Sequence, residues 1–147
     1  QKVVRETRKI LGRYKNGRIE PAEFDVECTC VRVPVLEGHL EAIFVETEKH
    51  CSADDVKYAM EGFNEACRER YGSLPSSPER TITILDRAPQ PRFDAELDKG
   101  MTIVVGRIEE SDGNWIKYLV LSHNLKKGAA LGTTQVMEYL LREGYII

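Results

Sequence analysis

Two stretches in the second half of the chain, residues 101–108 and 115–122, alternate between apolar and polar side chains over much of their length. This period of two is typical of β-strands with one buried face. Residues 111–114 between them read Ser-Asp-Gly-Asn, a run that favours a tight turn. The pattern therefore predicts an antiparallel hairpin and indicates that this part of the chain belongs to a sheet.

The same alternation occurs at residues 24–30, where Phe, Val, Cys and Cys are separated by acidic residues and threonine. We expect a strand here with one buried face, and a second strand at residues 40–47. Residues 34–38 begin with proline and end with glycine, so they should form the bend between the two strands.

Arg32 continues the buried parity of the first of these strands, and His39 would lie at the mouth of the second. A guanidinium on an apolar face is costly unless an anion meets it, and its planar fork suits a carboxylate. An imidazole at a strand mouth can move protons near neutral pH. The structural alternatives are an arginine that is half exposed or paired with a nearby acid, and a histidine without a catalytic role.

Helices are predicted on both sides of these strands. Residues 2–11 carry one apolar stripe, and Gly12 ends it. Asn16 and Gly17 then predict a turn. Ser52 with Asp55 begins a second helix, close to a capping box, which ends at Gly72. The other expected elements are a loop at 74–79, a short strand at 81–85, an extended arm at 87–92 that contains two prolines, and a last helix that carries Val136, Met137, Leu140 and Leu141.

Two further groups of residues could bind charged ligands. Glu6 and Lys9 are three positions apart and so share one face of the first helix, where the ordinary interpretation is a surface ion pair. The small residues at 128–130 precede the last helix, and free amides at a helix start favour anions. The alternative there is an ordinary helix that begins with small residues.

Composition narrows the function classes. The 147 residues carry a net charge of −3, with both signs mixed along one expected domain, which argues against a nucleic-acid interface. No apolar run reaches the length of a membrane span. Four cysteines at uneven spacings favour reduced thiols in a cytoplasmic protein. Cys28-x-Cys30 has the wrong spacing for a zinc knuckle, so we expect no metal site.

Four segments in order, at residues 6–12, 30–39, 87–92 and 123–130, resemble the aspartate-semialdehyde dehydrogenases. The second segment matches that family's active-site pattern Cys-x-Arg-Val-x-Val-x-x-Gly-His. The resemblance extends over nearly the whole chain. The matching residues of the second segment are Cys30, Arg32, Val33, Val35, Gly38 and His39.

The resemblance implies an α+β fold with a mixed, largely antiparallel sheet and helices on one face, as in the C-terminal domain of glyceraldehyde-phosphate-dehydrogenase-like enzymes. In such enzymes the other face of the sheet meets a partner subunit, so we expect a homodimer. Apolar residues of both parities in the first strand, such as Val26 against Val31, fit a strand that is covered on both faces.

The resemblance also implies roles for individual residues. His39 would be the catalytic acid/base. Arg32 would bind the carboxylate of the substrate, Glu6 its ammonium group, and Lys9 the phosphate. Each pairing fits the charges involved. Arg92, in the extended arm, would assist near the active site.

The segment 123–147 would return toward a cofactor domain, where Asn124 and Gly128 would lie near the nicotinamide of NADP. His123 directly precedes Asn124, and we leave it out of the expected catalytic set.

The implied reaction reduces L-4-aspartyl phosphate to L-aspartate 4-semialdehyde with release of phosphate, in the biosynthesis of lysine, threonine, methionine and isoleucine. The family's glycine-rich dinucleotide turn and its Asn-Cys-Ser/Thr-Thr nucleophile segment have no match here. We therefore expect residues 1–147 to be a catalytic and dimerisation fragment that is inactive alone. The alternatives are a related acyl reductase, such as a malonyl-CoA reductase, and a non-catalytic dimerisation module.

Overall fold

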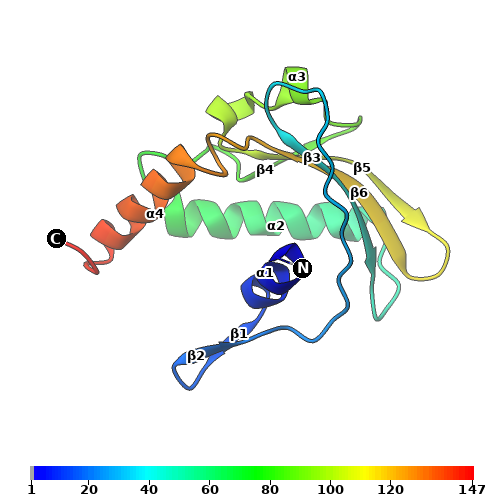
Figure 1. Ribbon diagram of the computed structural model, residues 1–147, viewed down its shortest axis with the longest axis horizontal. Helices are drawn as coiled ribbons and strands as arrows, with labels where there is room; N and C mark the ends of the chain where they lie inside the picture. Colours follow the sequence, from blue (N-terminus) through cyan, green and yellow to red (C-terminus); the bar gives the residue numbers. More distant parts are fainter. Residues whose placement is uncertain (1) are drawn as a thin grey trace. The chain divides into compact units, whose positions relative to one another are not determined.

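The computed structural model describes residues 2–147 of the chain. Two compact units make up the chain, the first ending at Pro34 and the second running from Val35 to Ile147. The predicted site residues fall into two sets, one on each unit. Figure 1 shows the order of the elements along the chain.

The first unit contains helix α1 (Lys2–Ile10) and a hairpin of β1 (Arg13–Lys15) and β2 (Arg18–Glu20). The turn residues Asn16 and Gly17 both have positive φ, 52° and 79°, as a two-residue hairpin turn requires. Gly12 lies between the helix and the hairpin. A larger residue would not fit there, because a Cβ would lie 2.3 Å from the carbonyl oxygen of Glu20. The predictions of a helix and an Asn-Gly turn are therefore confirmed.

The strand predicted at residues 24–30 is wrong. Residues 21–38 form no regular strand, and the supposed buried residues Phe24, Cys28 and Cys30 are exposed, as is Arg32. An alternating sequence forms a stable strand only where a neighbouring strand provides partners for its backbone hydrogen bonds. In the described part of the chain, no strand pairs with this segment. The inference that it was a strand covered on both faces falls with it.

The second unit is built on a four-stranded mixed sheet in the order β3-β6-β5-β4. β6 pairs antiparallel with both neighbours, and β4 is parallel to β5. A bulge between Gly106 and Glu109 interrupts the β5–β6 register, and Arg107 within it has φ 51°. The predicted hairpin and the strands near 40–47 and 81–85 are confirmed. Their bounds are β3 (His39–Glu46), β4 (Ile82–Leu85), β5 (Ile103–Ser111) and β6 (Trp115–Ser122).

Helix α2 (Ala53–Tyr71) crosses one face of this sheet (Figure 1). The expected capping box is present, with Ser52 and Asp55 each bonding the other's backbone, and Gly72 ends the helix. Val56 and Met60 are half-buried, but Phe63 is 53% exposed.

The opposite face of the sheet carries the buried cluster of Ala95, Val104 and Leu121, with Leu85 and Leu97 packed against it. Ala95 and Leu97 come from the segment of the short helices α3 (Pro91–Asp94) and η1 (Leu97–Gly100), which lie across the sheet from α2 (Figure 1). A last helix, α4 (Ala130–Arg142), follows the sheet as predicted. The expected α+β class is confirmed. None of the described helices is both long and apolar enough to span a bilayer.

The arm predicted at residues 87–92 is extended only in part, because Pro91 begins α3. Proline is favoured in the first turn of a helix, where its missing N–H is not needed. The carboxylate of Asp94, 3% exposed, closes the arm. It accepts two parallel bonds of 2.7 Å from the guanidinium of Arg87 and one of 2.7 Å from the Gln90 N–H. The arm is thus a closed loop held by one ion pair, in which Asp94 is buried and Arg87 is half exposed.

Replacing Asp94 with asparagine should lower the free energy of unfolding at neutral pH by about 1–3 kcal/mol. Hydrogen bonds from Arg87, and then from the Gln90 backbone, hold the pKa of Asp94 below its ordinary value, although burial opposes the shift. A lowered folded-state pKa stabilises the fold above the unfolded-state pKa, and this contribution is lost as the pH falls through the folded-state value.

Urea unfolding of both proteins over a pH series measures this effect. The difference between wild type and Asp94→Asn should shrink in acid. Asp54→Asn is the matched control, because Asp54 forms an exposed pair with Lys57 and its side chain is 89% exposed. A difference that is constant with pH, or equal to that of the control, would refute the role of the Asp94 carboxylate.

Candidate active site

His39 is the first residue of β3, and the turn before it is closely packed. The N–H of Gly38 donates to Oδ1 of Asn124 at 2.7 Å. Gly38 has φ +95°, and a Cβ there would lie 2.9 Å from a methyl carbon of Leu121. Only glycine satisfies both constraints. On the other side, His39 pairs in the sheet with Ser122.

The position predicted for His39, at a strand mouth after a bend, is confirmed. Its side chain is exposed and makes no hydrogen bond to the described residues. The imidazole is therefore free to meet a ligand while its backbone is fixed on both sides. Its catalytic role stays a prediction.

Asn124, expected near the nicotinamide, makes a contact that the sequence did not indicate. Its side-chain oxygen binds the turn before His39, which brings the segment after β6 against the predicted acid/base residue. Its side-chain nitrogen makes no hydrogen bond within the described chain and is left as a donor. Gly128 is exposed, and a Cβ there would be 3.0 Å from the carbonyl oxygen of Asn124. The roles of Asn124 and Gly128 in cofactor binding stay predictions.

On the first unit, Glu6 and Lys9 both lie on the exposed side of α1, whereas Val4, Thr7 and Arg8 are half-buried. The Glu6–Lys9 ion pair that was the alternative interpretation is not formed. Glu6 instead lies 3.8 Å from Nζ of Lys2.

Arg32 is also exposed, and in the part of the chain described it has no carboxylate partner within ion-pair distance. The structural alternative of a paired arginine is therefore not what is observed. All three side chains are accessible to an anionic or zwitterionic ligand, and their roles stay predictions.

His123 was left out of the expected set, yet it is 1% exposed and forms the most connected polar cluster near His39. Its Nε2 lies 2.9 Å from Oε2 of Glu37 and 3.0 Å from Oε1 of Glu96. Its Nδ1 accepts a hydrogen bond of 3.2 Å from the N–H of Leu125. Lys126 also bonds Glu96, and the contacts from Lys126 and then His123 hold the pKa of Glu96 below its ordinary value.

Two carboxylates and an imidazole within reach of one another can bind a metal ion. The backbone donor at Nδ1 argues against this here. A metal-bound histidine usually donates its second ring N–H, whereas Nδ1 of His123 accepts, so the ring proton must be on Nε2 between the carboxylates. Both ring nitrogens of His123 are hydrogen-bonded, and the expectation of no metal stays a prediction.

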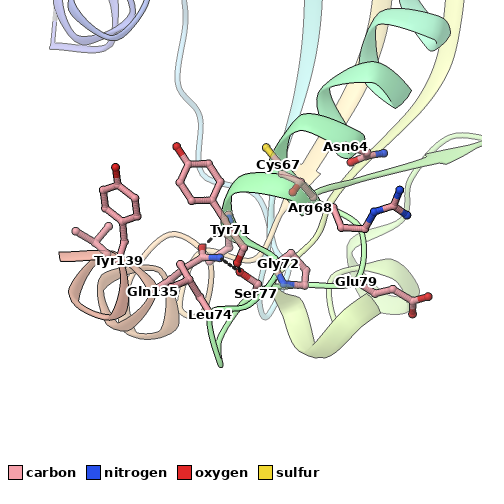
Figure 2. A pocket seen from close by; sticks show the side chains of 14 residues that line it. Asn64, Cys67, Arg68, Tyr71, Gly72, Leu74, Ser77, Glu79, Gln135 and Tyr139 are labelled. Carbon is pink, nitrogen blue, oxygen red and sulfur yellow. Dashed lines mark hydrogen bonds between the residues drawn. The ribbon is translucent and has the colours of Figure 1, made fainter. Parts of the chain in front are cut away.

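A cavity of about 320 Å³ lies between the end of α2, the loop after it and α4. Figure 2 shows Gln135 of α4 directed toward Ser77, to which it donates at 3.0 Å. Lys127 also lines the cavity; burial lowers its pKa, and its Nζ donates to Gln135 at 3.3 Å. None of the predicted site residues lines this cavity, so it is not part of the predicted site.

The fold and the histidine-bearing turn define an α+β dimerisation domain of the glyceraldehyde-phosphate-dehydrogenase type. The chain belongs to the semialdehyde dehydrogenase family of dimerisation domains, whose model matches residues 1–127.

Comparison with individual proteins agrees. An aspartate-semialdehyde dehydrogenase of Archaeoglobus fulgidus is 37% identical over 99% of this chain and 41% of its own length. A malonyl CoA reductase (NADP) of Metallosphaera sedula is 33% identical over 99% of this chain and 42% of its own. The crystal structure of the Candida albicans aspartate-semialdehyde dehydrogenase with NADP superposes with a TM-score of 0.85 at 33% identity, covering 99% of this chain and 42% of that one. The chain thus spans about two fifths of the length of the relatives it matches.

Proposed function

We propose that this chain is the catalytic and dimerisation portion of an NADP-dependent aspartate-semialdehyde dehydrogenase. The longer enzyme reduces L-4-aspartyl phosphate to L-aspartate 4-semialdehyde and releases phosphate, in the biosynthesis of lysine, threonine, methionine and isoleucine. The observation that carries the proposal is the 37% identity to an enzyme of that name over nearly the whole chain. The cofactor domain and the nucleophilic cysteine would come from the rest of the enzyme.

Within this proposal, the residues divide the work by charge. Arg32 binds the α-carboxylate of the substrate through its planar fork, Glu6 binds the α-ammonium, and Lys9 binds phosphate. His39 exchanges a proton with the nucleophilic thiol and with the carbonyl oxygen of the substrate. Its exposed imidazole on a fixed backbone supports that role.

NADPH supplies the hydride when bound. Asn124 would donate from its side-chain nitrogen to the carboxamide of the nicotinamide, while its oxygen keeps the Gly38 N–H. Gly128 would leave room for the ring. The segment 123–147 would thus join the cofactor domain to the turn that carries His39.

A homodimer in the cytoplasm completes the proposal. The face of the sheet opposite α2 exposes three large apolar side chains, Leu40 at 45%, Phe44 at 65% and Trp115 at 41%. Their shared parity with Leu121 places them on one face. A second subunit would cover them, as the family of dimerisation domains suggests. All four cysteines are free thiols, which fits a reducing compartment.

Malonyl-CoA reduction is the second candidate, because the Metallosphaera sedula relative covers the chain equally well. The two substrates differ in the leaving group, phosphate or coenzyme A, and at the α-carbon. Aspartyl phosphate carries an α-ammonium that Glu6 can meet, and malonyl-CoA has none. The glutamate therefore favours the first candidate.

The test is to assay the full-length enzyme with each substrate. We expect phosphate-dependent reduction of NADP by aspartate semialdehyde, and loss of that signal when phosphate is omitted. Oxidation of NADPH by malonyl-CoA, measured in parallel, should be slower by orders of magnitude in kcat/KM. Preference for malonyl-CoA would establish the second candidate, and activity with neither substrate would favour the non-catalytic module.

A further inference from the structure

We infer that His123 is a positioning residue for His39 and acts through the turn at residues 34–38. This inference rests on the proposed function, since it deepens the role of His39. No sequence pattern or comparison assigns a role to His123. His123 and its neighbour Asn124 contact two consecutive residues of the turn, Glu37 and Gly38, which directly precede His39.

The imidazole of His123 has one orientation available. The Leu125 N–H donates to Nδ1, so the ring proton is on Nε2, which hydrogen-bonds Oε1 of Glu96 at 3.0 Å and lies 2.9 Å from Oε2 of Glu37. Gly100 packs against the ring, because a Cβ at Gly100 would lie 2.7 Å from its Cδ2 atom. Gly100 has φ +76°, which favours glycine independently. Contacts on the ring face and at both nitrogens hold the side chain in place.

This fixed ring and its neighbour hold the turn at two consecutive residues. Nε2 of His123 lies 2.9 Å from the carboxylate of Glu37, and Oδ1 of Asn124 accepts the N–H of Gly38 at 2.7 Å. The next residue of the turn is His39. The end of β6 therefore holds the residues before His39 by side chains, and Ser122 holds His39 itself by strand pairing.

Glu96 makes the arrangement dependent on the imidazole. The Nε2–H group lies between the carboxylates of Glu37 and Glu96, and Lys126 contacts only Glu96 of the two. Without the imidazole, Glu37 loses its partner and faces a like charge, so the turn should move away from β6. A displacement of about 1 Å at a catalytic group can cost on the order of 10²-fold in rate.

The experiment uses the full-length enzyme with His123→Leu, His123→Gln and the control His50→Gln, which changes an exposed histidine. Glutamine places an amide donor near the position of Nε2, so it should restore much of what leucine loses. We expect His123→Leu to lower kcat about 10–100-fold with little change in KM. In a His39→Ala background the same substitution should have no further effect, because His123 acts through His39.

Hydrogen exchange of the Gly38 amide gives a readout that does not depend on activity. We expect His123→Leu to speed this exchange at least about 10-fold, with His50→Gln unchanged and His123→Gln in between. Unchanged exchange would overturn the inference, even in an active enzyme. Faster exchange with wild-type kcat would also overturn it, as would equal losses of rate in the wild-type and His39→Ala backgrounds. Faster exchange in an enzyme without dehydrogenase activity would instead overturn the proposed function and, with it, a role for His123 in that reaction.

Discussion

Replacing His39 with alanine in the full-length enzyme should lower kcat for phosphate-dependent oxidation of aspartate semialdehyde by about 10²–10⁴-fold. The imidazole is the proposed proton carrier for the thiol and for the carbonyl oxygen, and methyl cannot replace it. KM should change little, because Arg32, Glu6 and Lys9 carry the charges that bind the substrate. Steady-state kinetics over a range of aspartate semialdehyde concentrations separates the two parameters.

His50→Ala is the matched control, because His50 is exposed in the turn between β3 and α2. It should retain wild-type kcat. Thermal unfolding of the His39→Ala protein should match that of wild type, since the side chain of His39 makes no hydrogen bond to the described residues. If the His39→Ala enzyme keeps the wild-type kcat, His39 is not the catalytic acid/base.

Local patterns predicted the elements whose partners are close in sequence. The β5–β6 hairpin has its turn within four residues, and the capping box of α2 needs only Ser52 and Asp55. The Asn16-Gly17 turn similarly requires positive φ at both positions. In each case the interacting residues are close together in the sequence, so a local pattern is enough to predict the element.

The alternation at residues 24–30 failed for the complementary reason. A period of two describes which side chains could share a face, but a strand also needs an edge with free backbone groups beside it. The described chain pairs no strand with this segment. Arg32 was therefore placed on a buried face that does not exist here. The prediction that it meets an anion depends on its exposure instead.

In the candidate site, too, local patterns could be predicted and contacts between distant segments could not. His39 could be located from the Gly38-His39 pair and the strand that follows. The contact from Asn124 to Gly38 joins residues 86 positions apart, and no local pattern reports it. The His123 network is still less visible, because Glu37, Glu96 and His123 come from three separate segments. The only sequence signal was the position of His123 directly before Asn124.

Substituting Arg32 with leucine should raise KM for aspartate semialdehyde by about 10²–10³-fold and leave kcat less affected. The guanidinium is the proposed partner of the α-carboxylate, and it is exposed and without an ion-pair partner in the described chain. Arg32→Lys keeps the charge but loses the planar fork, so it should recover only part of the affinity. A wild-type KM for Arg32→Leu would show that another residue binds the carboxylate.

Glu6→Gln, measured in the same assay, makes the test specific for the substrate. Both candidate substrates carry a carboxylate, so an effect of Arg32 alone fits either one. Only the aspartyl substrate carries an ammonium group. Because Glu6→Gln removes the charged partner of that group, it should raise KM about 10-fold or more. Since Glu6 lies on the exposed side of α1, its substitution should not disturb the helix. A large effect at Arg32 with none at Glu6 would show that Glu6 does not bind the ammonium and would remove its argument for the aspartyl substrate, whereas effects at both would identify a substrate that carries both charges.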